Sequence, residues 1–406
     1  MAKKDILKDI NDASTVYSKP FFCPFPFKYI YGEQDGKYKL CSEAIASDIT
    51  SDDMSILDWF SSDYMDSIRS EMVSDTPDYN VLSKSCKICL ESEASTGNST
   101  RTNLLKRTGT STTQNANLYN LTGEYWFFNR PLVVQMRMFA RNDTCNLGCY
   151  MCFPKFSTIR QRDIASIPDL SMQEEFVSKE KNEDAVQVSR IESVIEAAEH
   201  ISTLELIGGE PLYIKECFDF VEKLVKKVDC SDMELSIFTN LSVLSNKGKN
   251  FLDYTKHFKN VLFKVSFDGI GKYNEYIRKR SVFKDLEENI LHVKNSSNCD
   301  IFVWTTISML SILRFDEVEK WCKDKNIRYE SNILKDPKML SIIHLPDPIK
   351  EELKIRFSHN SDIVNTLNAQ RDDAKFQKAI RYIKSLDKIY KSDVFDLYPE
   401  LEQYCK

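Results

Sequence analysis

Between residues 133 and 333, short runs rich in β-branched and aromatic residues alternate with amphipathic helical stretches. The predicted strands are Val133–Phe139, Thr203–Ile207, Glu234–Thr239, Val261–Phe267, Ile301–Ile307 and Arg328–Ile333. The predicted helices cover residues 185–198, 214–228, 284–296 and 315–325. Such alternation indicates a parallel sheet, because each helix returns the chain to the start of the next strand. We therefore predict an α/β fold of six β–α units, open or closed into a partial barrel.

The flanking regions differ in composition and set the expected domain boundaries. Residues 1–94 hold four cysteines among short apolar and aromatic segments, and residues 95–130, rich in Ser, Thr and Asn, are expected to be a polar linker. The barrel is assigned to residues 131–345 and a helical tail to residues 346–406. A polar insertion spans about Phe156 to Asp184, and the acidic run that overlaps it, residues 171–200, is interpreted as a solvated surface, with a lid over the neighbouring loop as the alternative.

Overall charge and hydropathy weigh against two classes of partner. The 406-residue chain has a formal net charge of −6, whereas a protein that binds large nucleic acids electrostatically is usually basic. No run approaches the roughly 20 apolar residues of a membrane-spanning helix, and the amino-terminal residues do not resemble a secretory signal. We therefore expect a cytoplasmic protein without a membrane partner.

The strongest chemical signal is a cluster of cysteines directly after the first predicted strand. Cys145, Cys149 and Cys152 form a C-x3-C-x2-C loop, and cysteine thiolates are the usual ligands of iron–sulfur clusters. Three thiolates leave one iron of a four-iron cluster open, and an open metal position is where a small molecule binds. A zinc site would need a fourth ligand, and the five histidines show no ligand spacing. The scattered cysteines are interpreted as buried or incidental thiols: Cys217, Cys230, Cys299, Cys322 and Cys405.

The cysteine loop and the strand ends that follow it resemble those of the radical S-adenosylmethionine (radical SAM) enzymes. Gly208-Gly209-Glu210, after the second strand, is similar to the motif of that family that receives the SAM ammonium. The resemblance assigns contacts with the SAM ribose, carboxylate or adenine to residues at the other strand ends and in the loop. These candidate cofactor-binding residues are Asn240, Ser266, Asp268, Arg278, Tyr150 and Met151. Met151 departs from the family, which often has an aromatic residue at that position.

The resemblance also implies a fold, cofactors and a reaction. The fold would be a partial (β/α)6 TIM-like barrel, and the cofactors a [4Fe-4S] cluster and SAM. One electron from a flavodoxin- or ferredoxin-type reductant would cleave SAM to methionine and a 5′-deoxyadenosyl radical, which abstracts hydrogen from a substrate. The sequence assigns no catalytic side chain, because no Ser/His/Asp or Cys/His constellation stands out.

Four further cysteines, Cys23, Cys41, Cys86 and Cys89, lie in the amino-terminal region. Asp35-Gly36 suits the turn of a hairpin that returns through residues 37–40 to Cys41. Together with an expected helix, Trp59–Met72, this region resembles a twitch domain, a shortened relative of the SPASM domain that holds an auxiliary iron–sulfur cluster. Four thiolates would close the coordination of that cluster and favour an electron-relay role. A four-cysteine zinc site is the alternative.

The tail strengthens the resemblance through Leu386-Asp387-Lys388 and residues 397–401, Leu-Tyr-Pro-Glu-Leu. The predicted function is therefore that of a radical SAM oxidoreductase acting on a peptide, with the auxiliary cluster relaying electrons. The same chemistry on a nucleotide or sugar is the alternative, since the family alone does not fix the substrate. A third interpretation is a non-enzymatic interaction protein stabilised by zinc or a cluster.

Overall fold

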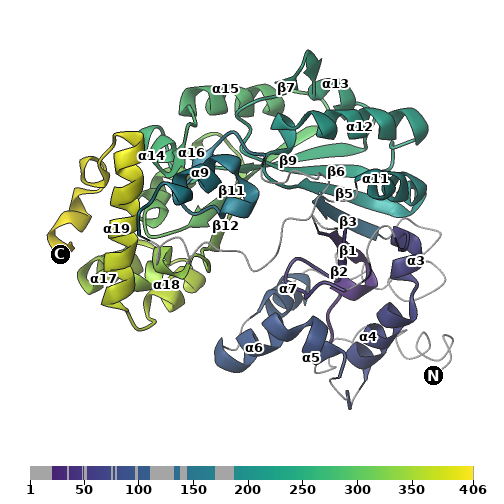
Figure 1. Cartoon of the computed structure of the whole chain (residues 1–406), viewed down its shortest axis with the longest axis horizontal. Helices are drawn as coiled ribbons and strands as arrows, with labels where there is room; N and C mark the ends of the chain where they lie inside the picture. Colours follow the sequence, from purple (N-terminus) through teal and green to yellow (C-terminus); the bar gives the residue numbers. More distant parts are fainter. Residues whose placement is uncertain are drawn as a thin grey trace.

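The computed structural model describes residues 21–33, 36–47, 49, 53–74, 76–77, 80–96, 99–109, 132–137, 144–169 and 187–405. At its centre lies one eight-stranded sheet with the order β12-β11-β9-β6-β5-β3-β1-β2 (Figure 1). The strands of this sheet are β1 Tyr29–Gly32, β2 Tyr38–Lys39, β3 Leu132–Arg137, β5 Ile201–Ile207, β6 Glu234–Thr239, β9 Asn260–Ser266, β11 Cys299–Ile307 and β12 Arg328–Ile333. All neighbours are parallel except β1 and β2. Because β12 and β2 end the order, the described sheet is an open, partial barrel.

The α/β fold and all six predicted strands are confirmed. The bounds of β6 and β12 agree with the prediction, and β5, β9 and β11 differ from it by one or two residues at an end. The expected strand Val133–Phe139 is β3, and its last two residues lie outside the described part of the chain. The strands could be predicted because apolar residues alternate along them. In β9, Val261, Phe263 and Val265 are buried while the residues between them are half-buried.

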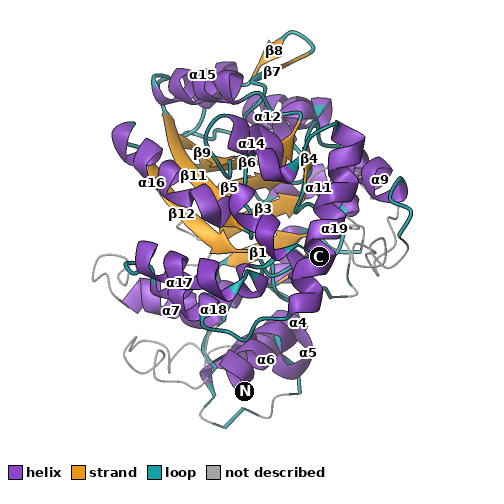
Figure 2. Ribbon diagram, turned by 90° about the vertical axis from the view of Figure 1, so that its left-hand side faces the viewer, coloured by secondary structure: helices purple, strands orange, loops and turns teal. Residues whose placement is uncertain are grey.

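Helices cover the outer face of the curved sheet (Figure 2), and apolar side chains of the strands pack with theirs in one core. The predicted helices appear as α11 Gln187–Glu196, α12 Lys215–Lys227, α15 Phe283–Lys294 and α16 Phe315–Asp324. Each presents one apolar stripe; in α12 the buried stripe includes Phe218, Val221 and Leu224. Shorter elements complete the barrel: β4 Gly148–Cys149, α9 Thr158–Ala165, β7 Ser245–Asn246, β8 Lys249–Asn250, α13 Leu252–Thr255, α14 Lys272–Ile277 and β10 Arg278–Lys279.

The amino-terminal region is joined to the barrel through the sheet itself. β1 pairs in parallel with β3, and β2 returns antiparallel to β1, which confirms the predicted hairpin. Gly36, at the turn, has a φ of 88°. In Figure 1 the helix α3 Ile56–Phe60 lies beside this edge, and below it lie α4 Asp63–Val73, α5 Leu82–Ser85, α6 Lys87–Thr96 and α7 Thr100–Gly109. The sheet therefore runs continuously across the predicted boundary between the amino-terminal domain and the barrel.

Three sequence interpretations need correction. The expected helix Trp59–Met72 is two helices, α3 and α4, because Ser62 caps a new helix by accepting a hydrogen bond from the Met65 amide. The predicted linker contains α7, so residues 100–109 are helical rather than a loop. The insertion described as polar begins with α9, whose Ile159 and Ile164 are buried, so residues 158–165 belong to the packed structure. Residues 170–184 of that insertion lie outside the described part.

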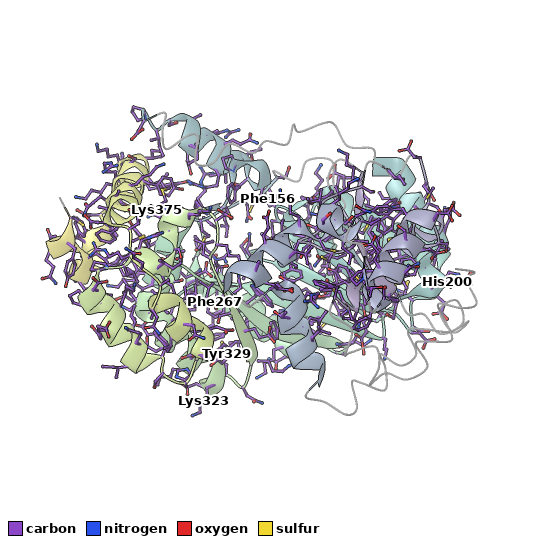
Figure 3. All side chains as sticks on the ribbon, turned by 90° about the horizontal axis from the view of Figure 1, so that it is seen from below. Phe156, His200, Phe267, Lys323, Tyr329 and Lys375 are labelled. Atoms are coloured by element: carbon purple, nitrogen blue, oxygen red, sulfur yellow. The ribbon has the colours of Figure 1, made fainter. Side chains whose placement is uncertain are left out.

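The tail is helical, as predicted, and forms the end of the molecule opposite the amino-terminal helices in Figure 1. It comprises α17 Asp347–Arg356, α18 Ser361–Leu367 and α19 Asp373–Tyr390. The predicted stripe of α19 is buried: Phe376, Ile380, Ile383 and Leu386. Figure 3 shows the molecule from below. Lys375 marks α19 in this view, and the buried Phe267 lies near the middle. Among the described residues, no helix combines the length and hydrophobicity needed to cross a lipid bilayer.

Candidate functional site

The cysteine loop is held by backbone pairing at the carboxyl end of the parallel sheet. β4 within the loop pairs antiparallel with β10, which places Cys149 opposite Arg278. The Tyr150 amide also donates to the Ile277 carbonyl at 2.9 Å. On the other side, the Ser157 hydroxyl at the start of α9 donates to the Leu147 carbonyl at 2.9 Å. Because the backbone is fixed on both sides, the loop presents its thiols in a defined arrangement.

The three thiols predicted to bind the cluster lie close together. Cys149 and Cys152 hydrogen-bond to each other, and Cys145 accepts a hydrogen bond from the Leu147 amide at 3.5 Å. The Asn240 side-chain amide, at the end of β6, approaches the Cys145 sulfur at 3.9 Å. Burial raises the pKa of the Cys145 thiol, so this thiol is neutral unless a nearby positive charge or a metal stabilises the thiolate.

A buried ion pair supplies positive charge at this point. Arg278 contacts the Asp268 carboxylate at 2.8 Å and donates to the Cys149 sulfur at 3.8 Å. Asp268 is fixed in turn by the Thr306 amide, which donates to its Oδ1 at 2.8 Å. The two candidate residues Asp268 and Arg278, 10 residues apart in sequence, are thus brought together beside Cys149. A guanidinium here offsets the negative charge of thiolates in a dry environment.

Glu210 links the ends of two neighbouring strands. It follows β5, is 1% exposed, and accepts hydrogen bonds from the Thr239 hydroxyl at 2.5 Å and the Asn240 amide at 2.6 Å, both at the end of β6. The Leu212 amide donates to the same carboxylate at 3.2 Å. Burial raises the pKa of Glu210 to about 7, while these hydrogen bonds oppose the shift. A cationic ligand beside the carboxylate would favour its ionised form.

Gly208 provides the first testable prediction. Its φ of 146° lies in a region that residues with a Cβ rarely adopt, and Gly209 does not share this conformation. We expect Gly208→Ala to lower the free energy of unfolding by about 1–3 kcal/mol, which is the usual cost of such backbone strain. Urea unfolding in the absence of ligands measures this cost. Gly209→Ala is the matched control, and an equal loss in both variants would contradict the conformational explanation.

The remaining candidates are distributed around this centre. Asn240 is beside Cys145, as described, and Ser266 is the last residue of β9, where its side chain is half-buried. Met151 is buried within the loop. The side chain of Tyr150 is directed into the tail, because its hydroxyl donates to Asp387 of α19 at 3.0 Å. The expected cofactor contact of Tyr150 stays a prediction, and the structure shows its hydroxyl bound to the tail.

Residues 141–324, which contain the three cysteines and the candidate cofactor-binding residues, match the family model of the radical SAM superfamily. The chain carries a radical SAM domain. The cofactors that this domain implies are a [4Fe-4S] cluster and SAM, as the sequence resemblance predicted. The partial barrel is the fold expected of such a domain.

Two solved structures illustrate how far the similarity extends. anSMEcpe with bound AdoMet has a TM-score of 0.37 and 17% identity, over 60% of this chain and 63% of that chain. SuiB of Streptococcus suis bound to S-adenosylmethionine has a TM-score of 0.37 and 13% identity, over 79% of this chain and 69% of that chain. The match thus spans less than two thirds of the length of anSMEcpe. A search of curated proteins finds no match to this chain.

The four amino-terminal cysteines surround one pocket next to the radical SAM domain. Cys23, Cys41, Cys86 and Cys89 border a pocket with about 530 Å³ of space free of atoms, part of it open to solvent. Burial raises the pKa of Cys41 to about 11 and that of Cys86 to about 12, so these thiols are neutral until a metal binds. In the part of the chain that the structure describes, no three Cys, His, Asp or Glu side chains converge on a point that could hold a single metal ion. Thiols that surround a pocket suit a group in which each binds a different iron.

Arg101, in the segment predicted to be a linker, supplies the cation of this pocket. It lies on α7, pairs with Glu93 of α6, and donates to the Phe22 carbonyl at 3.1 Å, next to Cys23. Its guanidinium interacts electrostatically with Cys23 and Cys89. The only sequence signal for this residue is its basic side chain, because the surrounding composition is that of a loop.

The face of the sheet opposite the helices carries polar and aromatic side chains that the sequence analysis missed. Gln135, Glu205 and Lys264 come from three strands of the radical SAM domain: the Gln135 amide donates to Glu205 at 2.8 Å, and Lys264 forms an ion pair with Glu205. Farther along, the Trp304 indole donates to Asn332 at 2.7 Å. Alternation within the strands could have indicated this face, since these positions interrupt the apolar series. We call these five residues the inner-face set.

The inner-face set adjoins the amino-terminal pocket. Tyr29 of β1 donates to Glu205 at 3.5 Å. Tyr29, Tyr31 and Ile207 form a small apolar cluster against which Cys41 packs. The same strand therefore contacts both a cysteine of the pocket and a carboxylate of the inner face. The other cysteines take no part in either thiol group: Cys217, Cys230 and Cys322 are buried, and Cys299 and Cys405 are half-buried.

Proposed function

We propose that this chain is a radical SAM enzyme that abstracts hydrogen from a peptide substrate. The observation that carries the proposal is that Cys145, Cys149 and Cys152 lie close to one another and beside a buried Arg278–Asp268 pair at the carboxyl end of the sheet. Membership of the superfamily indicates an enzyme, and this arrangement of donors fits a cluster with one open iron.

The residues of the site would have separate roles in binding the cluster and SAM. The three thiols would hold the cluster, and Arg278 would offset their charge. When bound, the cluster and SAM would supply reductive cleavage to a 5′-deoxyadenosyl radical. The Glu210 carboxylate and the backbone at Gly208 and Gly209 would receive the SAM ammonium, since a buried carboxylate attracts a cation. Asn240 and Ser266 would orient the remaining polar groups of SAM.

The inner-face set supports a peptide as the substrate. An amide, a carboxylate, an ammonium and an indole N–H from four strands of the sheet offer the donors and acceptors that a peptide backbone requires. Lys264 is 18% exposed in its side chain, and Trp304 is half-buried, so both are accessible to a ligand. The aromatic pair Phe238 and Trp304, with ring centroids 6.1 Å apart, keeps a nucleotide or sugar as the second candidate, because a ring can stack there.

The amino-terminal thiols support an electron-relay role for an auxiliary cluster. Four thiols around one pocket would close the coordination of a cluster, and Arg101 would offset its negative charge. The contact between Cys41 and the tyrosines of β1 places this pocket next to the inner face, where an electron from a substrate radical could be accepted. A flavodoxin- or ferredoxin-type protein would supply the electron for SAM cleavage.

Anaerobic incubation tests the proposed function. Reconstituted protein with SAM, dithionite and candidate peptides is expected to release 5′-deoxyadenosine, with deuterium transferred from a labelled peptide. Release only with nucleotides or sugars would replace the peptide proposal. Colourless protein that contains zinc and no acid-labile sulfide would contradict the enzyme proposal and support the zinc-stabilised interaction protein.

The relay role has its own test. Electron paramagnetic resonance of the triple variant Cys145→Ala/Cys149→Ala/Cys152→Ala would report the auxiliary cluster alone. We expect its spectrum to be the same with and without substrate, because all four ligand positions are protein thiols. A change on addition of substrate would indicate direct ligation and contradict the relay.

A further inference from the structure

The carboxy-terminal helix α19 contacts the cysteine loop at three points. The Tyr382 hydroxyl donates to the Tyr150 carbonyl at 2.7 Å, and the Tyr150 hydroxyl donates to Asp387 at 3.0 Å. At the third point, Gly148 faces Tyr390 so closely that a Cβ at this position would lie 2.5 Å from the Tyr390 hydroxyl oxygen. A tail that only covered the barrel would not need polar contacts with both the backbone and a side chain of this loop.

Asp387 binds several neighbouring groups besides Tyr150. Its carboxylate, 5% exposed, accepts hydrogen bonds from the hydroxyls of Tyr276 at 2.8 Å and Ser392 at 2.7 Å, and from the Val394 amide at 2.8 Å, besides Tyr150. A buried carboxylate with this many donors is strongly oriented. It therefore fixes Tyr150 from one side and Tyr276, two residues before Arg278, from the other.

A buried ion pair of α9 also contacts α19. Arg160, fully buried, pairs with Asp163 at 3.1 Å and contacts Tyr382. The Tyr390 hydroxyl donates to the same Asp163 at 2.6 Å. The Arg160 guanidinium also interacts electrostatically with Cys152. The loop is thus contacted by two helices that are about 220 residues apart in sequence.

We propose that Tyr382 and Asp387 are positioning residues of the cluster site. Tyr150 follows Cys149 and precedes Cys152 by two residues, so fixing its carbonyl and its hydroxyl fixes the backbone that carries both thiols. The inference rests on the proposed function only in taking these thiols as cluster ligands. It makes the tail a part of the site, although no residue of the tail belongs to the matched family segment.

Hydrogen exchange of the full-length protein tests the contact itself. In Tyr382→Phe and Asp387→Asn, the amides of residues 147–153 are expected to exchange roughly three- to tenfold faster than in the wild type, as the loss of a buried hydrogen bond implies. Tyr398→Phe is the matched control, since Tyr398 is a fully buried tyrosine of the same tail whose hydroxyl has no hydrogen-bond partner among the described residues. This control should leave exchange of the loop unchanged.

A second measurement connects the contact to the cluster. After reconstitution, both test variants should show altered g-values of the reduced cluster or a lower iron content, and Tyr398→Phe should show neither. Unchanged loop exchange in both test variants, or equal acceleration in the control, would overturn the inference. If the wild type binds no iron, the proposed function fails, whereas the exchange experiment still decides whether α19 positions the loop.

Discussion

Replacing Cys145, Cys149 and Cys152 together by alanine is expected to abolish cleavage of SAM while leaving about half of the iron bound, because the amino-terminal thiols form a separate group. The physical reason is that SAM would bind an iron without a protein ligand, and of the two proposed clusters the one held by three thiols would leave such an iron. Iron, acid-labile sulfide and 5′-deoxyadenosine measured on the same anaerobic preparation check both parts of this expectation.

Cys322→Ala is the control for that variant. Cys322 is buried on α16 and belongs to neither thiol group, so its loss should leave the iron content and the cleavage of SAM unchanged. Full iron content in the triple variant would show that the loop does not hold a cluster. Loss of all the iron would show that the two thiol groups depend on each other.

Arg278→Met is expected to produce the second large effect. The Asp268 carboxylate, fully buried, would lose its charged partner, and an unpaired buried charge costs about 3–5 kcal/mol of stability. Urea unfolding of the metal-free protein under reducing conditions measures the loss. Metal-free protein is used because it separates the ion pair from any contribution of bound iron.

The double variant Asp268→Asn/Arg278→Met distinguishes the effect of the unpaired charge on stability from the effect of altered packing. Asparagine keeps an oxygen that can accept from the Thr306 amide, and it removes the unpaired charge, so much of the lost stability should return. The double variant should nevertheless bind the cluster less well than the wild type, because the positive charge beside Cys149 is missing. A double variant as unstable as Arg278→Met would mean that packing, not the ion pair, is responsible.

The barrel could be predicted because its signals are local. Alternating apolar residues in strands such as β9 and apolar stripes in helices such as α12 need only neighbouring residues. The parallel pairing of β1 with β3 joins segments about 100 residues apart and leaves no turn signal between them. α7 was missed for another reason: its Ser/Thr-rich surroundings favour a loop, and the contacts of Arg101 with Glu93 and Phe22 are tertiary.

The site was predictable to a similar degree. The spacing of three cysteines and the two glycines before Glu210 are visible in the sequence, whereas the inner-face set comes from separate strands and has no motif. Asp387 gives a weak signal. It falls four residues after Ile383, on the apolar stripe of α19, and a charged residue at a core position usually has a buried partner. The partner, Tyr150, is more than 200 residues away.

The hydrogen bonds between β1 and β3 also bear on how such proteins can be recombined. A domain whose strand pairs with a strand of the next domain cannot simply be exchanged, since separating the two exposes a row of unpaired amides and carbonyls. A chimaera that swaps the cysteine-rich half for another would have to import a strand of matching register. The ladder also resists hinge motion, so the two groups of thiols are expected to keep a constant separation throughout turnover.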